Sequence, residues 1–262
     1  MFRLTRSPPY FSLSSRASPL VLFVSDLHLG RPEAGDAADV QAFTRLLEGH
    51  SDADALFIVG DLFDAWIEYR HVVPRASVRL LGALAAWSDA GKRLVVHAGN
   101  HDPWHRTFVR DELGAEYYPD GLDETLEGRR VFIHHGDGLV PAGVYRRLRP
   151  VLRHPVPVSL YRLLPVDVGV GLARRVSARM RRRHNVGAAA MRAWARDQLA
   201  AGRAGAIVFG HTHVPELHLW PEGVYANPGA WYETRTFIRL DEDGWTLARW
   251  TEQGAQVVER GA

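Results

Sequence analysis

Five short apolar segments of this chain each run into a cluster of histidine, aspartate or asparagine, and this repeated pairing constrains the fold most strongly. The first segment, residues 20–24, leads into Ser25-Asp26-Leu27-His28. Side chains two residues apart at the end of an extended strand point the same way, so Asp26 and His28 can hold one cation from one side. Because Asp-x-His alone occurs in many unrelated proteins, the other four segments decide what this pair does.

The other four segments also have the length and composition of buried strands. The segments are residues 55–59, followed by Asp61; residues 93–97, followed by Asn100 and His101; residues 131–134, followed by His135; and residues 206–209, followed by His211 and His213. In open α/β sheets, ligands bind beyond the carboxyl ends of the strands. We therefore expect all of these side chains to converge on one rim.

Apolar residues at helical spacing follow each of the first three strands. They extend over residues 36–48 and 74–90, and a short helix is expected up to about residue 113. Strands that alternate with helices predict an α/β fold with a largely parallel sheet. From Glu216 onward, alternating apolar and polar residues separated by turns predict antiparallel strands. We expect one domain over residues 20–262.

Two segments depart from this pattern. Residues 1–19 contain three arginines and many Ser and Pro but no continuous apolar stretch, which is typical of a flexible N-terminal arm and not of a signal peptide. Residues 141–203 are rich in Arg and Pro and lie between the fourth and fifth strands, so a helical cap over the strand ends is expected there. No apolar run reaches the roughly 18 residues that indicate a membrane span, so we expect a cytoplasmic protein.

Positive charge is concentrated in the first part of this cap. Residues 141–185 contain eleven arginines and one acid, Asp167, whereas the whole chain has a net charge of only +2. Localised positive charge indicates an anionic partner at that surface. Lys92 is the only lysine, so a chain-wide preference for arginine is the alternative explanation. The candidates for substrate binding are Arg149, Arg153 and Arg179.

The types of candidate ligand limit the metal. The chain has no cysteine, which excludes disulfides, a cysteine nucleophile and thiolate metal sites. Imidazole nitrogens and carboxylate or amide oxygens suit Mn²⁺, Fe²⁺, Zn²⁺, Co²⁺ or Ni²⁺ better than Ca²⁺ or Mg²⁺. Seven ligands are too many for one ion but suit two ions that share a carboxylate and clamp the oxygens of an in-line displacement. The seven are Asp26, His28, Asp61, Asn100, His135, His211 and His213.

In their order along the chain, the five clusters resemble the motifs of the calcineurin-type metallophosphoesterases. These motifs are Asp-x-His, Gly-Asp-x-x-Asp, Gly-Asn-His-Asp, His-Gly-Asp and Gly-His-x-His, and they extend from Asp26 to His213. The resemblance implies a two-sheet sandwich flanked by helices and a centre of two divalent ions, with Mn²⁺ as the expected metal. It implies that one ion is held by Asp26, His28 and His213, that the other is held by Asn100, His135 and His211, and that Asp61 bridges them.

The same resemblance implies a division of catalytic roles. A hydroxide that bridges the two ions attacks phosphorus in line, because two cations lower the pKa of a shared water. His101 is not a ligand but stabilises or protonates the leaving oxygen, and Asp102 orients it. We expect Asp64 to hydrogen-bond a ligand, with helix capping as the alternative. We place His97 in the core, and we expect His134 in the core or in contact with a ligand but not as a ligand itself. The alternative for the whole set, structural turn residues, does not require five such clusters after strands.

A closer resemblance is to the UDP-2,3-diacylglucosamine hydrolases of lipid A biosynthesis. It is carried by residues 25–30, 60–66, 135–138 and 227–231, and residues 66–74 are most similar to the branch found in Bacteroidetes-type bacteria. His101 stands where the best-studied branch has arginine. The resemblance implies hydrolysis of the UDP-2,3-diacylglucosamine diphosphate to UMP and 2,3-diacylglucosamine 1-phosphate. It also implies an enzyme that is peripheral to the inner face of the inner membrane.

Cap composition fits such a substrate, since arginines bind phosphate oxygens and the many Val and Leu residues can line an acyl groove. The same surface can contact an anionic membrane, at about 1 kcal/mol per basic residue. The alternatives are another phosphodiester, nucleotide or phosphomonoester substrate, and a non-catalytic binding module. No ligand position is lost, which favours an enzyme, and the aromatic residues are scattered, so we expect no nucleic-acid partner.

Overall fold

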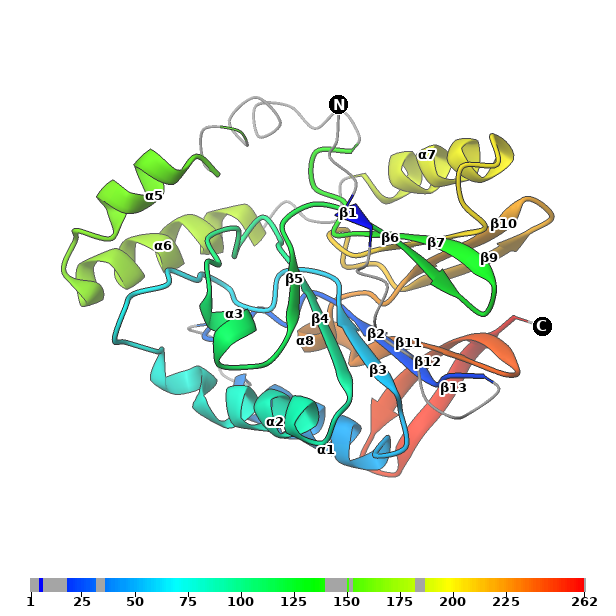
Figure 1. Ribbon diagram of the computed structural model, residues 1–262, viewed down its shortest axis with the longest axis horizontal. Coiled ribbons are helices and arrows are strands. Elements are labelled where there is room, and N and C mark those ends of the chain that lie inside the picture. The colour runs from blue at the N-terminus through cyan, green and yellow to red at the C-terminus, as the bar shows by residue number, and fades with distance from the viewer. Residues whose placement is uncertain are drawn as a thin grey trace.

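The fold is built on two sheets that pack face to face, as Figure 1 shows. The structure is a computed structural model, and it describes residues 5–6, 18–31, 36–139, 150, 153–181 and 187–261. Side chains at 5–6, 155 and 178–181 are outside this description. The first sheet has the strand order β13-β12-β11-β2-β3-β4-β5, and the second has the order β1-β6-β7-β8-β10-β9. The α/β fold class and the two-sheet sandwich expected from the sequence are confirmed.

Parallel pairing holds the centre of the first sheet, where β2, β3, β4 and β5 lie side by side. Antiparallel strands complete it, with β11 next to β2 and followed by β12 and β13. The strands are β2 (Val21–Val24), β3 (Ala55–Ile58), β4 (Arg93–His97), β5 (Glu116–Tyr118), β11 (Thr236–Asp241), β12 (Gly244–Thr251) and β13 (Gly254–Arg260).

The second sheet is mixed. Its strands β7, β8 and β10 are parallel, while β6 and β9 pair antiparallel to β7 and β10. They are β1 (Thr5–Arg6), β6 (Leu122–Leu126), β7 (Arg129–His134), β8 (Ala206–Phe209), β9 (Glu216–Trp220) and β10 (Gly223–Asn227). The sequence predicted β7 and β8 but did not assign them to a sheet separate from that of β2, β3 and β4.

Alternating residues of each central strand divide between two cores, because successive side chains of a strand point to opposite faces. On β2, Val21 and Phe23 face the second sheet, whereas Leu22 and Val24 face the helices α1 and α2. A fully buried side chain such as that of Phe23 contributes roughly 1.5–3 kcal/mol. The helices are α1 (Asp36–Gly49), the 3-10 helix η1 (Arg75–Ser77), α2 (Val78–Asp89), α3 (Phe108–Asp111), α5 (Pro155–Tyr161), α6 (Val166–Arg181), α7 (Ala188–Ala200) and α8 (Trp231–Thr234).

The predicted cap divides into two parts. Helices α5 and α6 lie away from both sheets, on the left of Figure 1. Helix α7, which the sequence placed in the cap, instead covers the outer face of the second sheet, where Met191 and Leu199 pack against Ile207. Within the described ranges, none of the helices is long and apolar enough to cross a membrane. The predicted N-terminal arm lies outside the described residues except for β1, which pairs with β6, and residues 18–19.

Candidate metal centre

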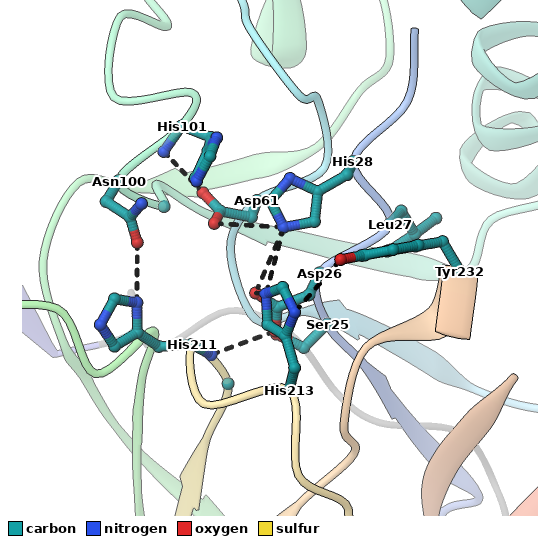
Figure 2. Close-up of polar contacts among 12 residues, drawn as sticks. Ser25, Asp26, Leu27, His28, Asp61, Asn100, His101, His211, His213 and Tyr232 are labelled. Atoms are coloured by element: carbon teal, nitrogen blue, oxygen red, sulfur yellow. Dashed lines mark hydrogen bonds and ion pairs between the residues drawn. The ribbon is translucent and has the colours of Figure 1, made fainter. Parts of the chain in front are cut away.

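The seven predicted ligands come together where the strand ends of the two sheets meet. Those that follow β2, β3 and β4 come from the first sheet, and those that follow β7 and β8 come from the second. Figure 2 shows the labelled members pointing toward one another from these loops. The side chains of Asp26, His28 and Asp61 are completely buried. The convergence expected from the sequence is therefore present, but it draws on two sheets.

One group of donors surrounds a point between Asp26, His28 and His213. The Nε2 atoms of His28 and His213 are 3.3 Å apart. Oδ1 of Asp26 lies 3.3 Å from Nε2 of His213 and 3.8 Å from Nε2 of His28. Three donor atoms from two sheets thus face one position, as the ligands of a single cation do.

A second group lies around Asn100. Its Oδ1 atom is 2.7 Å from Nδ1 of His211 and 3.1 Å from Nε2 of His135. The Asp61 carboxylate lies between the two groups, with Oδ2 at 3.4 Å from Nε2 of His135 and 3.6 Å from Nε2 of His28. This position between the groups is the one that a shared carboxylate requires.

The donor atoms fit a pair of divalent cations. Oδ1 of Asp26 and Oδ2 of Asp61 are buried and accept no hydrogen bond among the described residues. A buried carboxylate oxygen without a hydrogen bond is destabilising unless a cation or another charge compensates it. Since both oxygens face imidazole nitrogens at 3.3–3.8 Å, a cation between them would coordinate oxygen and nitrogen together.

Backbone strain is concentrated at the same residues. Five of the seven have φ angles between 47° and 68°, in the left-handed region that non-glycine residues rarely adopt, and they are Asp26, His28, Asp61, His211 and His213. Such a conformation costs roughly 1–3 kcal/mol per residue and persists where function requires it. The strain supports a binding role for these loops in preference to a role as ordinary turns.

Two glycines in the motifs allow the loops to approach closely. A Cβ atom on Gly99 would overlap the carboxylate and backbone nitrogen of Asp61. A Cβ atom on Gly210 would overlap the hydroxyl of Ser25, which donates a 2.5 Å hydrogen bond to Oδ2 of Asp26. The glycines that precede Asn100 and His211 are therefore required by packing.

Charges balance one another in the cluster. Burial lowers the pKa of His213, but the Asp26 carboxylate outweighs this and raises it to about 9. Burial likewise opposes the positive charge on His135, and Asp61 raises its pKa to about 10. Burial lowers the pKa of His211 to about 4. Cation binding would thus release protons from imidazole rings, as metal binding to histidine does generally.

A ring of further contacts orients the ligands. Nδ1 of His213 lies 3.3 Å from Oε1 of Glu233 and 3.4 Å from the Tyr232 hydroxyl, both on α8. Nδ1 of His28 lies 3.6 Å from Oδ1 of Asp64, so Asp64 is beside a candidate ligand, but the distance is longer than that of the expected hydrogen bond. Sequence reasoning missed Glu233, although it follows the segment 227–231 that carried part of the resemblance.

Glu233→Gln should weaken divalent-metal affinity by roughly 10–100-fold, because a carboxylate on the far nitrogen of a liganding histidine fixes its orientation and raises its basicity. Calorimetric titration of the metal-free protein with Mn²⁺ measures the change. Glu222→Gln, at an exposed turn, is the matched control and should bind like the wild type. Unchanged affinity in Glu233→Gln would show that His213 does not depend on this carboxylate.

His101 lies beside the Asp61 carboxylate in Figure 2, and its backbone N–H donates to Oδ1 of Asp61 at 2.8 Å. The expected partnership with Asp102 is wrong. The Asp102 carboxylate accepts hydrogen bonds from the N–H groups of Gly99 (2.8 Å) and Phe63 (3.1 Å), and it lies 3.3 Å from Nε2 of His105. Asp102 therefore shapes the turn that carries Asn100 and His101.

The predicted substrate arginines have different outcomes. Arg153 is turned into the protein, where its guanidinium donates to the carbonyl oxygens of Gly99 and Pro119 and to Oδ2 of Asp137. Arg153 therefore stabilises the turn at Gly99, and the N–H groups that make these hydrogen bonds already have acceptors within the protein. Arg149 lies outside the described residues, and so does the side chain of Arg179. Substrate contacts by these two stay predictions.

His97 and His134 are in the core as predicted. Nδ1 of His97 lies 3.2 Å from the carbonyl oxygen of Asp120, and the ring stacks on Tyr118. Burial lowers the pKa of His97 to about 4. Nδ1 of His134 accepts a hydrogen bond from the N–H of Gly136. Neither ring belongs to a candidate metal-binding group among the described residues.

Comparisons with known proteins agree with this geometry. The model of the calcineurin-like phosphoesterase family matches residues 19–215. A UDP-2,3-diacylglucosamine hydrolase of Porphyromonas gingivalis is 36% identical over 166 residues, which are 62% of this chain and 63% of that protein, so the match spans less than two thirds of it. One of Pseudomonas savastanoi pv. phaseolicola is 31% identical over 239 residues, 87% of this chain and 94% of that protein. Among solved structures, the E. coli phosphoesterase Yfce has a similar fold, with a TM-score of 0.50 at 17% identity over 93% of this chain and 98% of that one.

Proposed function

The chain belongs to the calcineurin-like phosphoesterase family, and on that premise we propose that it hydrolyses the diphosphate of UDP-2,3-diacylglucosamine to UMP and 2,3-diacylglucosamine 1-phosphate. The observation that carries the proposal is the match of 239 residues to a UDP-2,3-diacylglucosamine hydrolase, because it spans 87% of this chain and hence more than the metal centre alone. A match confined to the metal-ligand motifs would support phosphoester hydrolysis but not this substrate.

In this proposal Asp26, His28 and His213 would hold one cation, Asn100, His135 and His211 would hold the other, and Asp61 would be shared. Mn²⁺ is the metal that we propose. When bound, two such cations neutralise phosphoryl oxygens and lower the pKa of the attacking water. The residues of the chain orient these charges in a buried site, where electrostatic stabilisation is strongest.

His101 acts at the leaving oxygen. Its ring packs edge-on against His28 with centroids 4.6 Å apart, so it lies next to the first donor group. Burial lowers the pKa of His101, while the nearby Asp61 carboxylate favours its positive form. From this position His101 donates a hydrogen bond or a proton to the oxygen that departs from phosphorus.

The cap supplies an apolar surface for the two acyl chains. On α6, the exposed residues Val168, Leu172 and Val176 are four residues apart and share one face. On α5, Leu163 just beyond the helix end is 80% exposed, and Val156 and Leu160 are exposed as well. Exposed apolar side chains gathered on one element indicate a binding surface. The guanidinium of Arg174 reaches Gly30, so a positive charge lies at the border of this surface and the metal centre.

We place the enzyme at the cytoplasmic face of the inner membrane, where such a glycolipid would be presented to the cap. The support is chemical. An apolar surface next to arginine suits both the acyl chains and the anionic head groups around them. No nucleic acid is required as a partner.

Release of UMP from UDP-2,3-diacylglucosamine with added Mn²⁺ tests the proposal. We expect turnover that stops with EDTA and returns with Mn²⁺. UDP-N-acetylglucosamine, which has the diphosphate without the two long acyl chains, should have a much higher KM because the apolar contacts are missing. Rapid hydrolysis of bis(p-nitrophenyl) phosphate without hydrolysis of the diacyl substrate would support phosphoester hydrolysis but refute UDP-2,3-diacylglucosamine as the substrate.

A further inference from the structure

Ser177 belongs to cap helix α6 but is buried against the metal centre. Its side chain is 4% exposed, whereas its neighbour Val176 is 49% exposed. The Ser177 hydroxyl lies 2.7 Å from Nδ1 of His101 and donates a 2.7 Å hydrogen bond to Oδ1 of Asp64. A residue of the cap thus contacts the histidine proposed to act at the leaving oxygen.

These contacts determine which nitrogen of the His101 ring carries the proton. The Ser177 hydroxyl hydrogen points to Asp64, so its oxygen accepts from Nδ1 of His101. A second neighbour of Nδ1 is the carbonyl oxygen of Asp64 at 3.2 Å, which can only accept. Nδ1 therefore carries a proton, and Nε2 can donate to the leaving oxygen only when it is protonated as well.

Asp64 does not replace Ser177 in this arrangement. Its Oδ1 atom is 3.9 Å from Nδ1 of His101, beyond the length of a hydrogen bond. The hydroxyl of Ser177 spans that gap with two short contacts. The connection from Asp64 to the ring of His101 thus passes through the cap.

We propose that Ser177 is a positioning residue, contributed by the cap, that holds the ring of His101 in its working orientation. The inference rests on the role proposed for His101. A further contact joins the cap to the His101 loop, because the ring of Trp104 packs on Tyr161 of α5 with centroids 5.1 Å apart. Within the cap, the Tyr161 hydroxyl donates to the carbonyl oxygen of Gly169 on α6. The cap both contacts the substrate and completes the site that reacts with it.

A double-mutant cycle tests the proposal. Ser177→Ala should lower kcat roughly tenfold with little change in KM, the effect of losing one hydrogen bond of ordinary strength. In the His101→Ala background, Ser177→Ala should have no further effect, because Ser177 acts only through that ring. Ser177→Thr keeps the hydroxyl and should retain most of the activity. Ser159→Ala makes the same change at an exposed position of α5 and should behave like the wild type.

An equal loss of kcat in both backgrounds would overturn the proposal, because a purely structural effect on the cap does not depend on His101. So would a rise in KM at constant kcat, or a loss of bound Mn²⁺ in Ser177→Ala. Thermal melting checks that each variant folds, and the Ser177→Ala cycle tests the proposal even if the threonine variant packs poorly.

The cycle is also run on diphenyl phosphate, whose poor leaving group needs a proton donor. If the wild type cleaves only this ester, the proposed substrate is wrong while the cycle still tests Ser177.

Discussion

Asp61→Asn is expected to reduce kcat/KM by roughly 10³-fold or more and to lower the amount of Mn²⁺ bound per chain. The asparagine keeps the shape of the side chain but removes the charge that lies between the two donor groups, 3.4 Å from His135 and 3.6 Å from His28. Changes to residues that merely support a ligand typically cost 10–100-fold, so loss of the shared ligand should cost more. Metal content by elemental analysis and UMP release measure the two effects together.

The matched control for this change is Asp111→Asn. Asp111 is an exposed carboxylate that pairs with Arg110 on the surface, so its replacement should alter neither metal content nor rate. Full activity with two bound ions in Asp61→Asn would contradict the shared position of this carboxylate. Full metal content with lost activity would restrict its role to catalysis.

His101→Ala is expected to keep both metal ions and to lose activity by roughly 10²–10⁴-fold, the usual range for a general acid. We expect this result because the His101 ring lies next to the proposed ligands Asp61 and His28, while its Nδ1 atom contacts the hydroxyl of Ser177. Single-turnover measurements with saturating Mn²⁺ isolate the chemical step.

His71→Ala, at an exposed position, is the control and should match the wild type. Loss of bound metal in His101→Ala would assign His101 to the ligands, contrary to the proposed role. An effect on KM alone would make it a binding residue.

Local patterns in the sequence were sufficient to predict the strand ends and the candidate ligands. Apolar runs such as those of β2, β3 and β8 are buried wherever they pair, and the polar residue after each run must lie at its end. The prediction of Asp26, Asp61 and His213 as neighbours needed no knowledge of which strands pair. Strands β5 and β6 were missed because they are short or carry polar residues on one face.

The arrangement of long-range contacts could not be predicted in the same way. The separation of β7 and β8 into a second sheet depends on which strand faces pack together, and the apolar pattern of a single short segment does not contain that information. Asp102 was placed beside His101 because the two are adjacent in sequence, yet the tight turn directs its carboxylate back to Gly99. Ser177 is 76 residues from His101, and only the folded cap brings the two together.

Each proposed cation draws its ligands from both sheets. Asp26 and His28 follow a strand of the first sheet, while His213 follows a strand of the second; Asn100 and His135 are divided in the same way. In a chain without cysteine, the two ions would therefore serve as the cross-links of the sandwich at this edge. Removal of metal would leave the core intact, and at the edge where the strained loops meet the sheets would then be joined by hydrogen bonds such as that from the His211 N–H to Oδ2 of Asp26.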